Sequence, residues 1–165
     1  GRFGFGAPMS TSSHLVPRAM LLDAGVRPGI DVACYYYWHH ERAAKAVLMG
    51  EVEACGVRDL AGEKFLTRGL RVLAQSDPIA NFPLVVGPRT PSEIKDGLLK
   101  ALVVLPAEQS AVRAIMQGWD EELSGGFAPS AHGEFASVES LARRIFGPDW
   151  WRLPESGLSF ASGGG

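Results

Sequence analysis

Basic residues are not in surplus in this sequence. Lysine and arginine number 16 against 18 aspartate and glutamate residues, which gives a formal net charge of −2 and a pI near 6.1. No run of Lys and Arg follows one face of an expected helix or strand, as contacts to a nucleic-acid backbone would require. We therefore expect no nucleic-acid partner.

Long hydrophobic runs are also missing. A membrane-spanning helix needs about 20 consecutive apolar residues, whereas the longest candidate, residues 98–105, is interrupted by Lys100 and stops at Pro106. We expect no membrane insertion. The first residues carry neither a basic stretch nor a small-residue cleavage site, so we expect an excised piece without its targeting segment.

Cysteine is scarce, and the histidines lack the spacing of a metal site. Cys34 and Cys55 stand in no C-x-x-C pattern; they allow one disulfide or two free thiols, and free buried thiols are our prediction because buried Cys behaves as a small hydrophobe. His14, His39 and His40 show no H-E-x-x-H or Cys/His pattern. We expect no metal and no other cofactor.

Signatures of catalysis are weak. Ser10 and His40 would make a hydrolase pair, but there is no G-x-S-x-G motif and no orienting acid beyond Glu41, which adjoins His40 in sequence. Gly4 and Gly6 do not complete a dinucleotide fingerprint. We expect a protein that is not an enzyme, and a Ser-dependent hydrolase remains the weaker alternative.

What is present is a soluble α/β pattern, with 46% hydrophobic and 21% charged residues in 165. Strand-like and helix-like stretches alternate, which is typical of parallel β-α-β units. The sequence predicts strands at residues 2–6, 31–37, 54–57, 70–74 and 82–86, and helices at 14–24, 41–49, 60–66, 108–122 and 138–146, with another that opens at Pro91.

After the predicted strand at 82–86 the sequence predicts only helices. This leaves too little β-sheet for the apolar faces of these helices to be buried without another partner. We therefore expect residues 1–79 to form one α/β lobe. Residues 80–150 are expected to supply a strand and helices that need a further partner. The last stretch, 151–165, is rich in Gly and Ser and is predicted to be a disordered tail.

A serine-rich loop joins the first strand to the first helix: Ser10, Thr11, Ser12 and Ser13, here called the serine loop. The first N–H groups of a helix lack internal partners and carry partial positive charge, so hydroxyls gathered there suit an oxyanion. Serine and threonine are equally the ordinary N-cap residues. These residues alone therefore allow two interpretations, a ligand-binding loop and an ordinary helix N-cap.

Four motifs in order carry a family likeness: Ser10-Thr11-Ser12, His40-Glu41, Val47 through Ala54, and residues 70–79. With these the chain, over roughly residues 2–147, resembles the phosphate, phosphite and phosphonate-binding components of ABC importers, which are type II periplasmic binding proteins. The resemblance implies one βαβ lobe plus the C-terminal part of a second lobe, without the N-terminal half-lobe. On this ground residues 1–79 would be the anion-binding lobe, and residues 80–150 would supply the hinge return strand and the helices of the second, incomplete lobe.

The resemblance also implies a site. The serine loop and the His40 imidazole would hold the oxygens of phosphonate, phosphite or phosphate, and Tyr37, on a strand of alternating aromatics, is expected at the cleft mouth beside His40. Ser13 stands where the family usually has Gly, which adds a side chain beside the anion. Where similar aminoalkylphosphonate binders carry an acidic residue for the ammonium group of the ligand, this sequence has Phe82. The resemblance therefore disfavours aminoethylphosphonate.

From the resemblance we expect solute delivery to an ABC permease, in a periplasmic or lipid-anchored extracytoplasmic location. The alternative is a ligand-sensing domain of a signalling protein built on the same fold, in which closure around the ligand drives the output.

Overall fold

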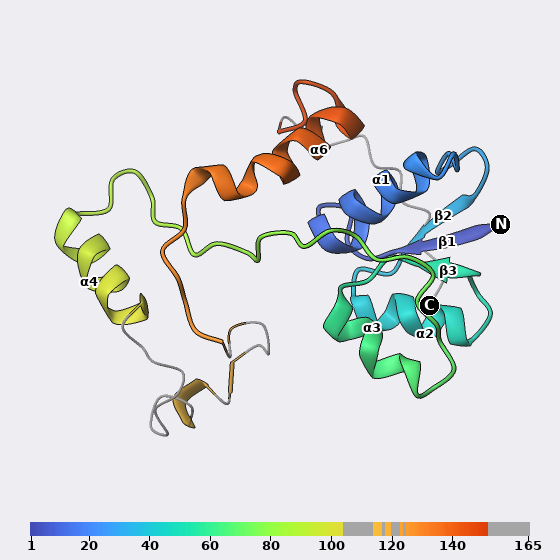
Figure 1. Ribbon diagram of the computed structural model, residues 1–165, viewed down its shortest axis with the longest axis horizontal. Helices are drawn as coiled ribbons and strands as arrows, with labels where there is room; N and C mark the ends of the chain where they lie inside the picture. Colours follow the sequence, from blue (N-terminus) through green and yellow to red (C-terminus); the bar gives the residue numbers. More distant parts are fainter. Residues whose placement is uncertain (104–113, 117, 120–122, 124, 152–165) are drawn as a thin grey trace. The chain divides into compact units, whose positions relative to one another are not determined.

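The computed structural model describes residues 1–103, 114–116, 118–119, 123 and 125–151. It forms two compact units, one of residues 1–78 with the segment from Ser137 onward, and the other of Ile79–Ala136 (Figure 1). The α/β fold class is confirmed in the first unit. Of the predicted tail, all but Trp151 lies outside the described residues.

A three-stranded parallel sheet forms the centre of the first unit. Strand β1 (Arg2–Phe5) lies between β2 (Ala33–Tyr36) and β3 (Ala54–Cys55), in the order β2-β1-β3. Both neighbours run parallel to β1, with Phe5 opposite Tyr36. All three carboxyl ends therefore lie at one edge of the sheet, here called the carboxyl edge.

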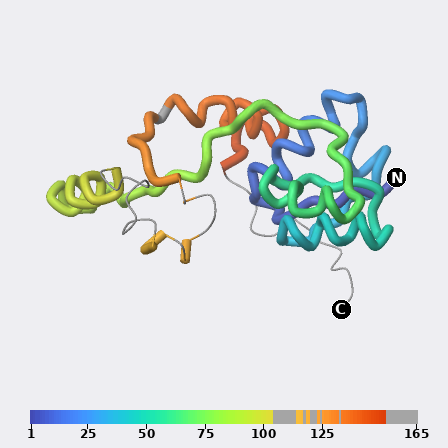
Figure 2. The backbone as a smooth tube through the Cα atoms, turned by 60° about the horizontal axis from the view of Figure 1, so that its bottom comes forward, coloured from blue at the N-terminus to red at the C-terminus, as the bar shows by residue number. Residues whose placement is uncertain are grey.

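Helices cover both faces of this sheet (Figure 1). On one side lies α1 (Val16–Asp23), which is preceded by the turn η1 (Thr11–Leu15); on the other lie α2 (His40–Leu48) and α3 (Asp59–Leu66), which contact each other (Figure 2). Because strand residues alternate between faces, Phe5 packs on the η1 side and its neighbour Gly4 faces the opposite layer. The apolar core includes Leu15, Val16, Ala19, Ala43, Ala44, Val52 and Phe65.

The end of α2 follows from its sequence. Gly50 has φ +73°, its N–H donates to Val47, and the next N–H, of Glu51, reaches back to Ala46 at 2.9 Å. This pair of bonds is the Schellman arrangement that glycine favours. Ala43, Ala44 and Ala46 form the buried face of α2, whereas Leu48 is 40% exposed.

The predicted strands at 70–74 and 82–86 are not formed. Val72 is 64% exposed and Val85 is 79% exposed. A strand is stabilised by hydrogen bonds to a neighbour, and no segment among the described residues pairs with this stretch. This stretch carries β-forming side chains, but none of the described segments is the partner strand that they need.

The second unit contains α4 (Ser92–Val103) and the short turn η3 (His132–Phe135). The opening of α4 at Pro91 and Ser92 agrees with the sequence, and none of its side chains is buried. The predicted helix at 108–122 lies mostly outside the described residues.

The C-terminal helix α6 (Ala136–Phe146) belongs mainly to the first unit. Arg144 forms an ion pair with Asp23 of α1 at 2.6 Å, and the ring of Phe146 lies 5.9 Å from that of His14. In the division expected from the sequence, residues 137–150 belong to the second lobe. The ion pair to α1 and the ring contact to η1 place α6 with the first unit.

Both cysteines are free. Cys34 lies opposite Phe3 on β2, and Cys55 lies opposite Gly4 on β3. The two strands flank β1, so two strand spacings, about 9.6 Å, separate them. A disulfide requires Cα atoms within about 7 Å, so the sheet topology keeps these thiols apart.

Candidate anion-binding site

The candidate site lies at the carboxyl edge of the sheet. The serine loop follows β1, His40 follows β2, and Arg58 follows β3. Because these parallel strands are neighbours, the segments that leave them start side by side. Crevices at this edge are where open α/β sheets bind ligands.

Ser10 begins the helical segment as an N-cap. Its backbone is extended, at φ −79° and ψ 130°, and its Oγ accepts the Ser13 N–H across 3.2 Å. The Ser10 carbonyl accepts the N–H of Leu15 at 3.0 Å, and that of Thr11 accepts the N–H of Val16. Bonds reaching five residues back define a π-helical turn, a rare geometry that is frequent at functional sites.

Two backbone donors of this turn stay available. Among the described residues, no acceptor takes the N–H of Thr11 or of Ser12. Both side chains are partly exposed. The hydroxyl of Ser10 accepts from Ser13 and retains its own proton to donate. The turn thus presents two amides and up to three hydroxyls at the positive end of a helical segment.

Ser13, in contrast, is part of the core. It is 1% exposed, and its carbonyl accepts the N–H of Gly6 at 3.0 Å. A Cβ on Gly6 would stand 2.2 Å from the Ser13 Oγ. Because its side chain is packed and its N–H is bound to Ser10, we remove Ser13 from the proposed ligand contacts.

His14 supports the loop from beneath, a role that the sequence did not suggest. It is 3% exposed, and its Nδ1 lies 2.5 Å from the carbonyl oxygen of Pro8. A carbonyl only accepts, so Nδ1 carries the proton and Nε2 accepts from the Tyr36 hydroxyl at 3.1 Å. Burial lowers the pKa of His14. A neutral imidazole therefore ties Pro8 to β2, and its only sequence signal is its position beside the apolar Leu15.

His40 opens α2 from a constrained turn. Trp38 adopts φ +65°, a left-handed conformation that bulky residues rarely take, and it turns the chain out of β2. The Arg58 N–H donates to the Nδ1 of His40 at 3.0 Å. In the neutral ring the proton is then on Nε2, which is the orientation of a hydrogen-bond donor to an anion.

Tyr37 does not point toward the serine loop. Its hydroxyl donates to the Glu51 carboxylate at 3.1 Å, beyond the C-terminal end of α2, whereas His40 starts that helix. Its ring lies 3.1 Å from the position of a Cβ on Gly4, on the face opposite η1. Burial raises the pKa of Tyr37. Strand alternation placed the phenol in the α2 layer, so we remove it from the proposed site.

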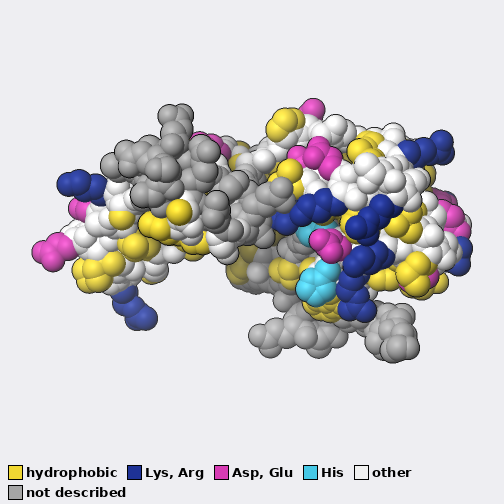
Figure 3. All heavy atoms as spheres, turned by 90° about the horizontal axis from the view of Figure 1, so that it is seen from below, with side chains coloured by type: hydrophobic (Ala, Val, Ile, Leu, Met, Phe, Trp, Pro, Cys, Tyr) yellow, Lys and Arg dark blue, Asp and Glu magenta, His cyan; other side chains and the backbone are white. Residues whose placement is uncertain are grey.

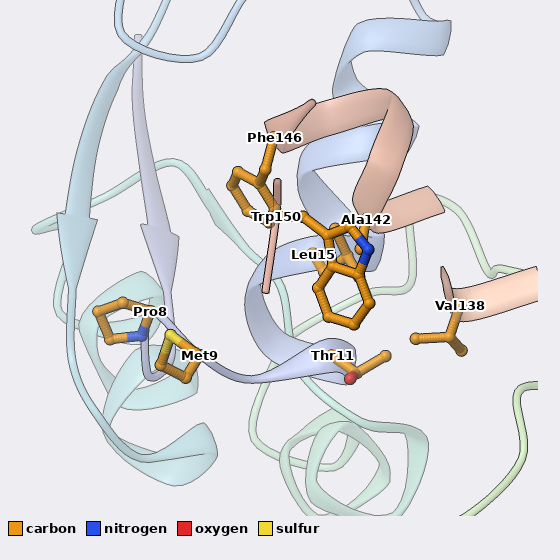
Figure 4. Close-up of a pocket in the computed structure, with 8 residues that line it drawn as sticks. All are labelled: Pro8, Met9, Thr11, Leu15, Val138, Ala142, Phe146 and Trp150. Atoms are coloured by element: carbon orange, nitrogen blue, oxygen red, sulfur yellow. The ribbon is translucent and has the colours of Figure 1, made fainter. Parts of the chain in front are cut away.

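Thr11 also borders a small pocket of about 90 Å³ (Figure 4). Leu15 and the C-terminal residues Ala142, Phe146 and Trp150 supply its apolar walls. The indole Nε1 of Trp150 is buried and has no hydrogen-bond partner among the described residues. Trp150 thus packs the segment that follows α6 against Thr11 and Leu15.

Two further features, a metal site and a membrane-spanning helix, are not found among the described residues. In the part of the chain that the structure describes, no three His, Cys, Asp or Glu residues converge as metal ligands. Likewise, none of the described helices is long and apolar enough to cross a bilayer.

The sequence matches a protein-family model over residues 1–132 of 165. That family is described as the periplasmic substrate-binding protein of phosphonate ABC transporters. It is a transport family and not an enzyme class. The match covers the sheet, the serine loop and His40, and on this basis the chain belongs to the phosphonate-binding family of periplasmic substrate-binding proteins.

Proposed function

We propose that this protein binds a tetrahedral phosphorus oxyanion at the carboxyl edge of its sheet and delivers it to an ABC permease outside the cytoplasm. The observation that carries the proposal is the π-helical turn, which leaves the N–H groups of Thr11 and Ser12 without an acceptor among the described residues. Backbone donors at a helical N-terminus are suited to phosphate-like groups.

In this proposal the ligand oxygens receive hydrogen bonds from the amides of Thr11 and Ser12 and from the hydroxyls of the first three loop residues. His40 donates from Nε2 to another oxygen, because the Arg58 N–H holds its Nδ1. Charge-assisted bonds of this kind are about twice as strong as neutral ones. No group in this set is a nucleophile with a base and an orienting acid, so we propose binding without chemistry.

Calorimetric titration of the full-length protein with phosphate, phosphite and methylphosphonate tests the proposal. We expect Thr11→Ala and Ser12→Ala each to weaken binding about tenfold, the effect of losing one charge-assisted hydrogen bond. Thr67→Ala, an exposed threonine after α3, is the matched control and should bind as the parent does. Equal affinity in the Thr11, Ser12 and His40→Ala variants would contradict the proposal.

A further inference from the structure

A basic groove lies between α2 and α3 and starts at the candidate site. Its volume is about 340 Å³, and His40 is one of its lining residues. Arg42 and Lys45 line it from α2, and Arg58 and Lys64 line it from the start and the body of α3. Figure 3 shows Lys, Arg and His side chains gathered on one face of the molecule.

The charge of this groove is one-sided. Among its lining residues, Glu41 is the only carboxylate against four cationic side chains. Its oxygen lies 3.9 Å from the Lys45 Nζ, and both side chains are more than half exposed; such a pair neutralises little of the field. The positive end of α2 opens toward the same side. Cations focused in a concavity of this kind attract anionic groups.

Two lysines line the same groove as His40. Lys45 lies five residues after His40 on α2, which corresponds to about 7.5 Å along the helix axis. Lys64 reaches the groove from the facing helix. A group held by His40 at one end can therefore place a second anionic group near the two lysines.

The geometry points to a ligand with two anionic ends, a phosphonate whose organic group carries a carboxylate. The inference rests on the proposed function: the phosphonate occupies the serine loop and His40, and the carboxylate extends into the basic groove toward Lys45 and Lys64. The same field repels an ammonium group, and in the sequence Phe82 stands where an acidic partner for such a group is expected.

The experiment compares four phosphonates on the full-length protein by calorimetry: methylphosphonate, propylphosphonate, 3-phosphonopropionate and 2-aminoethylphosphonate. Propylphosphonate matches the carboxylate ligand in length without its charge. We expect 3-phosphonopropionate to bind about fivefold or more tighter than propylphosphonate, as several partly exposed charge contacts allow. The aminoethyl ligand should bind most weakly. The preference should shrink as salt is added, because these charges are open to screening.

Substitutions then test whether Lys45 and Lys64 cause the preference for the carboxylate ligand. In Lys45→Gln/Lys64→Gln the affinity ratio of 3-phosphonopropionate to propylphosphonate should fall to about one. Lys100→Gln makes the same chemical change on α4, outside the groove, and should keep the parent ratio. Circular dichroism of each variant confirms that it is folded.

The outcomes separate the two ideas. Binding of methylphosphonate with no preference for the carboxylate ligand overturns the role of the groove and leaves the proposed function standing. A preference that survives Lys45→Gln/Lys64→Gln also overturns that role. If no phosphonate binds, the inference about the groove fails. The proposed function fails as well if phosphate and phosphite also do not bind.

Discussion

His14 is bonded to Pro8 through its Nδ1, which donates to the carbonyl oxygen across 2.5 Å beneath the serine loop. The ring also packs at 4.9 Å from Phe5. A buried histidine held in this way stabilises the fold only while it is neutral, because a second ring proton would remove the acceptor that Tyr36 bonds. The shape of the site thus depends on the protonation of a residue that does not touch the ligand.

Stability should fall on mild acidification through His14. Burial lowers the pKa of His14 in the folded state below its ordinary value of 6.5. Between these two values the unfolded chain binds more protons than the folded chain. The free energy of unfolding is therefore undiminished by His14 above about pH 6.5 and decreases as the pH falls toward the folded-state pKa. Urea unfolding at about pH 7.5 and about pH 5.5 measures the difference.

The matched variants separate this effect from others. His14→Gln should lose about 2 kcal/mol at neutral pH through lost packing and hydrogen bonds, and it should lose the dependence between the two pH values. His39→Gln, an exposed histidine, should retain it. Arg2 lowers the pKa of Glu53 from 4.5, so carboxylates of this kind change the free energy of unfolding only at lower pH. An unchanged slope in His14→Gln would contradict the assignment.

Ser10 should affect stability and binding through different atoms. Its Oγ caps the Ser13 N–H, so Ser10→Ala should cost about 1 kcal/mol of unfolding free energy. Ser10→Asp keeps an acceptor and places a negative charge at a helical N-terminus, which restores stability, but that charge repels an oxyanion and should abolish phosphonate binding. Thermal melts and titration measure the two effects; strong binding by the aspartate variant would show that the anion lies elsewhere.

Parts of the fold could be predicted because local signals and tertiary partners agree. The first three strands have both β-forming residues and neighbours in the sheet, and Gly50 marks the end of α2 through its positive φ. The stretch at 70–86 has the residues but no neighbour among the described residues, so composition alone was insufficient. The assignment of α6 depended on contacts such as Arg144 with Asp23, which sequence does not show.

The site was predictable at the level of segments and less so at the level of atoms. The order of motifs indicated the serine loop and His40, since both follow strands that end at one edge. It did not show that Ser13 turns inward against Gly6, because that depends on the phase of a π-helical turn. Nor did it show that the Tyr37 hydroxyl bonds Glu51, because one-residue alternation decides which face of a strand a side chain takes.

Cys55 should react slowly with thiol reagents. Burial raises the pKa of Cys55 from 9.0 to about 11, and only the thiolate is nucleophilic. At about pH 8 the thiolate population is then about a hundredfold smaller than for an unperturbed thiol. In Cys34→Ala, modification by a disulfide reagent should be slow under native conditions and fast in urea. Rapid native reaction would contradict the burial of this thiol.

The contact between Gly6 and Ser13 offers the sharpest test of the packing beneath the serine loop. A Cβ on Gly6 would lie 2.2 Å from the Ser13 Oγ and 2.6 Å from its Cβ. Both positions are fixed, since the Gly6 N–H donates to the Ser13 carbonyl. Gly6→Ala should therefore cost about 2 to 3 kcal/mol by overpacking, as measured by urea unfolding.

The double variant decides whether Ser13 is the cause. In Gly6→Ala/Ser13→Gly the obstructing side chain is gone, and the remaining neighbour, the Ser13 Cα, is at 4.0 Å, an ordinary contact. The double variant should regain about 1 to 2 kcal/mol relative to Gly6→Ala, a coupling expected only of residues in contact. Gly62→Ala, at an uncrowded position within α3, is the control and should be neutral or stabilising by up to about 1 kcal/mol. Additive losses in the double variant would mean that Ser13 faces outward, and Ser13 would then return to the set of ligand contacts.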